Sequence, residues 1–140
     1  MYDTVLVAVA GDESDPVVTN AIDLAERHDA RLVVLSVVDD RAFLTLDDDL
    51  AAEVEAELRE EAETQVGAVA DRTADAAIEA EGVVERGSPA DEILACAQRT
   101  GADCIVVGTR GDDYESRLVG SVSRDVLSRA RVPTLVVPLR

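Results

Sequence analysis

Three short, continuous apolar runs constrain the fold of this chain most strongly: TVLVAV (4–9), RLVVLSVV (31–38) and CIVVG (104–108). They are rich in Val and bounded by polar residues, which is typical of strands that are covered on both faces. Segments with helical periodicity separate them. This alternation predicts an α/β fold, in which right-handed crossovers build an open parallel sheet with helices on both faces.

Four segments carry the apolar spacing of helices, and we expect them at 16–28, 50–73, 89–100 and from about Gly120 onward. The second has an apolar stripe that begins at Leu50, and its other positions are largely acidic. In the fourth, Val126 and Leu127 are expected to face inward. These helices would cover the strands.

Capping residues predict where two of the helices begin or end. Ser88 and Asp91 have the spacing of a capping box at the start of the third helix, and Gly101 would terminate it. The first helix should end near His28, with Asp29 in the left-handed conformation of a turn. We therefore expect His28 to complement a helix dipole and assign it no catalytic role.

Two further segments read as strands at the edges of the sheet. Residues 77–87 alternate partly between apolar and polar, and Pro133 and Pro138 restrict PTLVVPL (133–139) to an edge because proline donates no ladder hydrogen bond. Residues 39–49 form the one long loop, after the carboxyl end of a strand, where such folds place their ligands. We read the whole chain, 1–140, as one domain.

The charge of the chain excludes several partners. Thirty acidic residues against thirteen basic ones give a net charge of −17, which should repel nucleic acid and anionic membranes. All of the basic residues are Arg. A surface adapted to high salt and a GC-rich genome both explain this composition. No run is long enough for a membrane helix, and the N-terminus lacks a basic segment, so we expect a cytoplasmic protein.

Few residues are suited to metal or covalent chemistry. Cys96 and Cys104 lack a CxxC spacing, and with His28 they do not make a zinc site, so we expect two buried thiols. Ser88 and Ser121 are better explained as hydroxyls at helix starts than as nucleophiles. We therefore expect neither catalytic residues nor a protein metal site.

With these segments in place, the chain resembles the universal stress protein family from end to end. The resemblance is carried by VLVAVAGDESD, AERHDARLVVLSVVD, GSPADEIL and DCIVVGTRG, and by VGSVSRDVLSRARVPTLVVP near the end. It implies a Rossmann-like, five-stranded parallel sheet in the order 3-2-1-4-5, similar to the adenine nucleotide alpha hydrolases. It also implies a role in stress resistance or regulation, and a homodimer that pairs through the last strand (134–138).

Many members of this family bind ATP through a glycine loop, in which backbone N–H groups and a helix start contact the phosphates. The residues that match its fixed positions are Gly108, Gly111, Gly120 and Ser121. By the same resemblance Val122 would join the phosphate contacts and Val38 would pack near the base. Arg110 could pair with phosphate oxygens, or with neighbouring acids on a solvated loop. The cofactor would be ATP with Mg²⁺.

This sequence departs from the ATP-binding pattern at three places. Eight residues, one fewer than the pattern has, separate Gly111 from Gly120. Ala10 stands where nucleotide-binding members usually carry Asp, and a methyl group binds neither ribose hydroxyls nor a metal. Asp112 and Asp113 would repel phosphates unless a cation lies between them. Two hypotheses stay open: a nucleotide-binding module, and a homodimeric module that has lost the nucleotide and acts on a protein partner.

Overall fold

The computed structural model describes residues 1–10, 15–109 and 121–139. It contains one five-stranded parallel sheet in the order β3-β2-β1-β4-β5, which confirms the predicted fold class. The strands are β1 (Thr4–Ala8), β2 (Arg31–Asp39), β3 (Ala80–Gly87), β4 (Cys104–Gly108) and β5 (Thr134–Val137). The helices are α1 (Asp15–His28), η2 (a 3₁₀ helix, Asp40–Phe43), α2 (Asp48–Ala74), α3 (Pro89–Thr100) and α4 (Ser121–Arg129).

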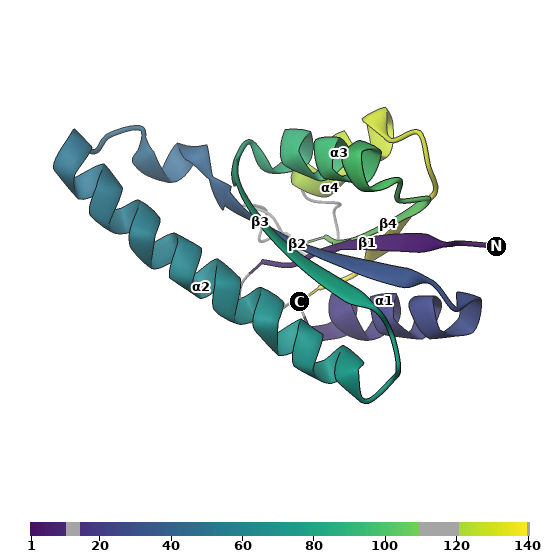
Figure 1. The fold of residues 1–140 in the computed structure, drawn as a ribbon. Helices are drawn as coiled ribbons and strands as arrows, with labels where there is room; N and C mark the ends of the chain where they lie inside the picture. The colour runs from purple at the N-terminus through teal and green to yellow at the C-terminus, as the bar shows by residue number, and fades with distance from the viewer. Residues whose placement is uncertain (11–14, 110–120, 140) are drawn as a thin grey trace.

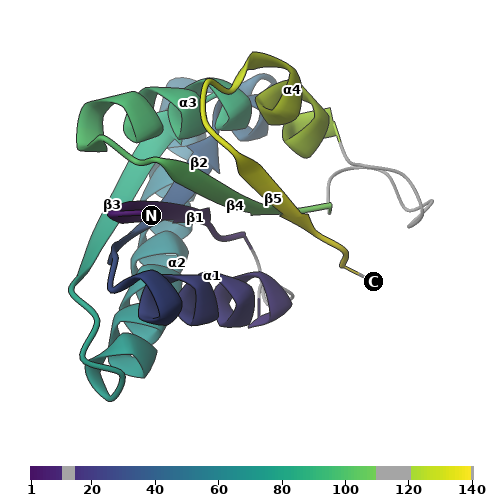
Figure 2. The same cartoon turned by 90° about the vertical axis from the view of Figure 1, so that its right-hand side faces the viewer.

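The sheet separates two helical layers (Figures 1 and 2). α1 and α2 cover one face, and α3 and α4 cover the other. Alternate residues of a strand point to opposite faces, so β1 sends Val5 and Val7 toward α1 and α2, and Leu6 toward α3 and α4. Each face therefore has its own aliphatic core, in keeping with a sequence that contains one Phe, two Tyr and no Trp.

The strands at the two edges are those expected from the sequence. Among the described strands, β3 pairs only with β2, and β5 pairs only with β4. β5 begins after Pro133 and ends before Pro138, so neither proline has to donate within the ladder. On the side of β5 that faces away from β4, no other described strand pairs with its backbone.

The helix ends largely follow the capping signals. α1 ends at His28, and Asp29 has a φ of 52°, while Gly101 has a φ of 71° after α3. Ser88 occupies the N-cap of α3, but its hydroxyl makes no capping hydrogen bond, so the expected capping box is absent. Proline at the first position already presets the backbone of that turn.

Two leucines that were expected to face the core are exposed. Leu50 is 44% exposed because the first turns of α2 project beyond the strands, where there is no sheet to cover (Figure 1). Leu127 is also 44% exposed, since its neighbour Val126 occupies the inward position of α4 and is fully buried. Farther along α2, Ala62, Val66 and Val69 are buried as predicted.

The segment 39–49 is more ordered than the loop expected from the sequence. Asp39 caps η2 by accepting a hydrogen bond from the backbone N–H of Arg41, and Phe43 is buried beneath the start of α2. Asp47 caps α2 in the same way, accepting from the N–H of Leu50. η2 therefore holds its residues at a fixed place beside the carboxyl end of β2.

Candidate functional site

The carboxyl ends of β1, β2 and β4 surround a cavity of about 240 Å³, which we call the strand-end cavity. In open parallel sheets this is the end at which ligands bind. Most of its walls are aliphatic. The lining residues are Ala8, Val9, Ala10, Val17, Leu35, Val37, Asp39, Arg41, Pro89, Ile93, Val107, Gly108, Val122 and Leu139.

A second recess of about 210 Å³, which we call the polar hollow, adjoins the strand-end cavity. The two share Asp39, Arg41, Pro89 and Val122. α3 and α4 both begin at the polar hollow. The described residues that line it are Asp39, Asp40, Arg41, Ser88, Pro89, Ala90, Ser121, Val122 and Asp125. An apolar compartment and a polar compartment thus lie side by side.

Asp39 and Arg41 form an ion pair in the wall common to both recesses. Arg41 donates from Nη2 to Oδ2 of Asp39 at 2.6 Å, and from Nε to the two carboxylate oxygens at 3.0 and 3.1 Å. The hydrogen bond from the Arg41 side chain holds the pKa of Asp39 below its ordinary value, against the opposing effect of partial burial. Asp39 is therefore a carboxylate at neutral pH.

The other carboxylates of the polar hollow are also paired with arginines. Asp40 accepts from Nε of Arg86 at 2.8 Å, and Asp125 accepts from Nη1 of Arg129 at 3.2 Å. No group of three or more His, Cys, Asp or Glu side chains that could hold a metal ion occurs within the described ranges. The ion pairs leave the hollow without a dense excess of negative charge.

The cavity brings together some of the residues that the sequence singled out. Gly108 and Val122 line the strand-end cavity, and Val122 and Ser121 line the polar hollow. Ser121 is the first described residue of α4. Arg110, Gly111 and Gly120 lie outside the described residues, as do Asp112 and Asp113.

The side chain of Val38 is not where the resemblance suggested. It is 3% exposed and packs with Phe43 and Ala62 under α2, and it does not line the strand-end cavity. Because side chains alternate along β2, its neighbours Val37 and Asp39 face the cavity instead. Val37 and Leu35 are therefore the aliphatic contacts that β2 offers to a ligand.

Gly108 has a packing role that is independent of any ligand. A Cβ atom added there would lie 2.5 Å from Cδ1 of Leu139 and 3.1 Å from Cγ2 of Val17. Leu139 is held in place because its backbone N–H donates to the hydroxyl of Thr109 at 2.9 Å. A larger residue at position 108 would require the Leu139 side chain to shift, so glycine allows this close packing on β4.

Sequence reasoning missed Asp39 and Arg41 as site residues. The sequence signal for them is their position at the start of the segment that follows a strand's carboxyl end, where such folds bind ligands. This position does not indicate which single side chains face the ligand. The pair forms because η2 turns the backbone so that Arg41 folds back onto Asp39.

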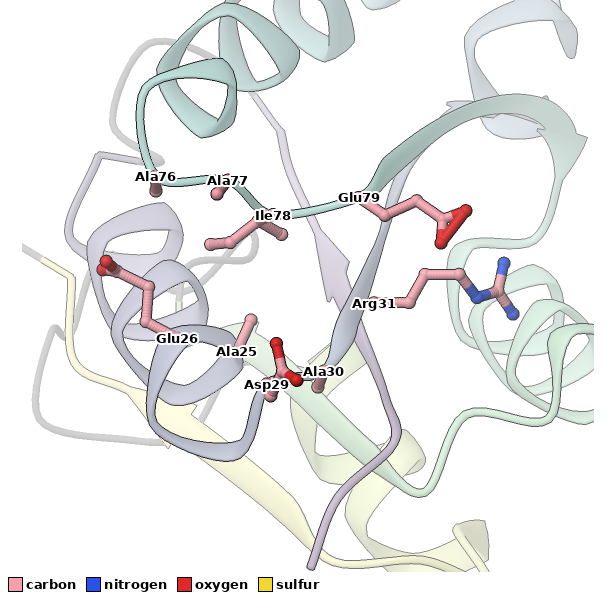
Figure 3. A pocket seen from close by; sticks show the side chains of 9 residues that line it. All are labelled: Ala25, Glu26, Asp29, Ala30, Arg31, Ala76, Ala77, Ile78 and Glu79. Atoms are coloured by element: carbon pink, nitrogen blue, oxygen red, sulfur yellow. The ribbon is translucent and has the colours of Figure 1, made fainter.

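A larger hollow of about 340 Å³ lies at the opposite, amino-terminal end of β2 (Figure 3). Small side chains such as Ala25, Ala30 and Ala76 line it, while Arg31 and Glu79 extend away from Glu26. Arg31 already bonds Glu81 and the carbonyl oxygen of Thr100. This hollow has neither an apolar compartment nor convergent polar groups, so we do not regard it as the functional site.

The cysteines are buried, as expected. Cys96 and Cys104 are free thiols in the cores on opposite faces of the sheet. Burial raises the pKa of both thiols, which disfavours the reactive thiolate. In the part of the chain that the structure describes, no helix is long and apolar enough to cross a membrane.

Comparison with protein families gives a match to the universal stress protein family over residues 1–138. The universal stress protein YxiE of Bacillus subtilis is 29% identical to this chain, and the alignment covers 98% of this chain and 99% of YxiE.

Solved structures agree with this match. The universal stress protein UspA from Lactobacillus plantarum has a TM-score of 0.79 at 28% identity, with 97% of each chain covered. A universal stress protein crystallised in complex with cAMP has a TM-score of 0.66 at 29% identity, covering 97% of this chain and 96% of that one.

Proposed function

Because this chain belongs to the universal stress protein family, we propose that it is a stress-response regulatory module that binds an adenine nucleotide weakly, without turning it over. The strand-end cavity is the proposed binding site. Support comes from the related structure in complex with cAMP, which has the same fold.

The observation that carries this proposal is the pairing of an aliphatic cavity with a charged wall. Val9, Val37 and Val107 offer surface on which the flat face of a base can pack, and the ion pair of Asp39 and Arg41 places charged groups beside that surface. Ligand sites in proteins commonly combine a mostly apolar lining with a few such polar groups. The cavity has these features, whereas the hollow at the amino-terminal end does not.

Ala10 is the reason for proposing weak binding. It lines the strand-end cavity at the position where the family resemblance implies an aspartate. A methyl group accepts no hydrogen bond from a ribose hydroxyl, so one directional contact to the sugar is missing. The base would still be accommodated by the aliphatic walls.

The ligand with the longest phosphate chain that we consider for this site is ATP, together with Mg²⁺. The glycine pattern Gly108, Gly111, Gly120 and Ser121 favours it, and Ser121 and Val122 lie at the wall where a phosphate chain would continue. When bound, the ion would neutralise phosphate charge near the carboxylates of the polar hollow. The shortened loop argues for a low affinity for the triphosphate.

A cavity-filling variant tests the proposed site. Ala10→Phe places a ring at an exposed position of the cavity wall, and should abolish the calorimetric binding of AMP and ATP to the wild type. Ala68→Phe, at an exposed position of α2, is the matched control and should bind as the wild type does. Equal binding by the wild type and Ala10→Phe would contradict the assignment of the site.

A second candidate function is a module that has lost nucleotide binding and acts on a protein partner. The packing of Gly108 against Leu139 and Val17 favours it, because this glycine is then needed for the fold alone. It predicts that neither AMP nor ATP releases heat and that no nucleotide copurifies. The same titration therefore separates the two candidates.

We further propose a homodimer that forms through β5, since β5 is an edge strand whose Leu135 is 40% exposed. Leu135→Asp should give monomers by light scattering. Val137, although on the same strand, is 6% exposed within the core, so its replacement would unfold the protein instead. Leu50→Asp, at a similarly exposed leucine on α2, should leave the dimer intact, and a monomeric wild type at micromolar concentration would contradict the proposal.

A further inference from the structure

Arg41 occupies a distinctive position in the two recesses. Among the described residues that line the strand-end cavity and the polar hollow, it is the only one with a positive charge, and it borders both. A ligand that placed an apolar group in the cavity and a polar group in the hollow would pass beside it. Its side chain is 57% exposed, so a ligand can reach it.

The guanidinium of Arg41 is held in place from two directions. Asp39 pairs with it through Nε and Nη2, which fixes the plane of the guanidinium. Its backbone belongs to η2, which is attached to β3 and α2 because Arg86 pairs with both Asp40 and Glu55. Arg41 is therefore presented at the mouth of the cavity on a restrained turn and not at the tip of a free loop.

The chemistry of this group selects an anion. A guanidinium has five N–H donors in one plane and pairs with phosphate through two parallel hydrogen bonds. A phosphate that arrived at Arg41 would compete with Asp39 for these donors, because each group presents two charged oxygens that can accept two parallel hydrogen bonds from a guanidinium. The negative charge of Asp39 therefore opposes the anion that Arg41 attracts.

We propose that Arg41 is a specificity-determining residue, which recognises the phosphate nearest the ribose and so makes the cavity select nucleoside monophosphates over nucleosides, with Asp39 as the carboxylate that limits their affinity. This inference rests on the proposed nucleotide function and names the group by which the site distinguishes its ligand. It assigns opposite effects to the two members of one ion pair.

The test is a calorimetric titration of AMP and of adenosine at one fixed ionic strength, with Arg41→Ala, Asp39→Asn and the wild type. Arg41→Ala should weaken the binding of AMP about tenfold and leave that of adenosine unchanged, because the nucleoside has no phosphate. Asp39→Asn should strengthen the binding of AMP, again without an effect on adenosine. Arg27→Ala, an exposed arginine of α1 that pairs with Asp23, is the matched control and should change neither affinity.

The two ligands separate this inference from the function on which it rests. If Arg41→Ala weakens the binding of AMP and of adenosine equally, or weakens the binding of neither, the proposed phosphate role of Arg41 is wrong, while the proposed nucleotide binding stands. If Asp39→Asn and Arg41→Ala both weaken the binding of AMP, the ion pair serves only to hold η2 in place, and the inference is also wrong. If the wild type binds neither ligand, the proposed function fails as well. Far-UV circular dichroism of each variant verifies that it is folded.

Discussion

The guanidinium carbon of Arg86 lies 4.2 Å from the centre of the Phe43 ring. The same guanidinium donates to Asp40 of η2 at 2.8 Å and pairs with Glu55 of α2. One side chain at the end of β3 thus connects the turn that carries Arg41 to the long helix beside it. The arrangement of the candidate site depends on this connection.

The contact between Arg86 and Phe43 predicts non-additive stabilities. Phe43→Ala should lower the free energy of unfolding by about 3 kcal/mol, since it empties a buried aromatic position. Arg86→Met should be less harmful in that background than in the wild type, because the ring that it contacts is already gone. Urea denaturation measures both differences. Arg99→Met, at an exposed arginine of α3, should be additive with Phe43→Ala, and additivity of Arg86→Met would refute the coupling.

Replacing two glycines by alanine, one in α2 and one in β3, should change the stability of the protein in opposite directions. A Cβ atom on Gly82 would overlap Cγ1 of Val66, so Gly82→Ala should destabilise the protein by about 1–3 kcal/mol. Gly67 lies within α2, and apart from its chain neighbours and the adjacent helix backbone no atom of the described residues comes within 4 Å of an added Cβ, so Gly67→Ala should stabilise the protein by about 1 kcal/mol. Thermal melts of the two variants provide the measurement. Equal effects would show that α2 does not pack closely on β3.

The strands and most helix boundaries could be predicted because they depend on local patterns, whereas the strand order was implied by the family resemblance. The run CIVVG matches β4 residue for residue, and Gly101 ends α3 with the positive φ that its position indicated. The exposure of Leu50 could not be predicted, since the apolar stripe of α2 continues past the edge of the sheet. Periodicity indicates which face of a helix is apolar, but not how far the partner surface extends.

The candidate site was predictable in position but not in detail. Parallel topology indicates that residues at the ends of β1, β2 and β4 converge there. The side that each residue faces depends on strand register, and this placed the side chain of Val37 in the cavity where Val38 had been expected. The pairing of Asp39 with Arg41 depends on the 3₁₀ turn of η2. This turn is only four residues long, and so short a segment has no sequence periodicity from which it could be predicted.

The ion pair of Asp39 should be visible in its titration. The hydrogen bond from Arg41 lowers the pKa of Asp39 in the folded protein, so the pair stabilises the fold above the ordinary pKa of an unfolded aspartate, about 3.9, and this contribution is lost as pH falls through the lowered value. In Arg41→Gln the pKa should move upward, toward the ordinary value. Carboxyl-detected NMR titration measures both. An unchanged pKa in Arg41→Gln would contradict this cause.

Restoring an acceptor at position 10 should strengthen nucleotide binding. Ala10→Asp places a carboxylate in the wall of the strand-end cavity, where it can accept hydrogen bonds from ribose hydroxyls. We expect the affinity for AMP to rise about tenfold, which corresponds to one good hydrogen-bonded contact. 2′,3′-Dideoxyadenosine monophosphate, which lacks both hydroxyls, is the control ligand and should gain nothing. A similar gain for this analogue would contradict the ribose contact.

The most direct test of the account is to map the amide chemical shifts of the wild type during titration with AMP and with ATP. We predict that the amides of Val9, Val37 and Val107, which line the strand-end cavity, shift in a saturable way, while those of Ala30 and Ala76 at the opposite hollow stay in place. Shifts confined to the opposite hollow, or none with either nucleotide, would contradict the assignment of this cavity as an adenine nucleotide site.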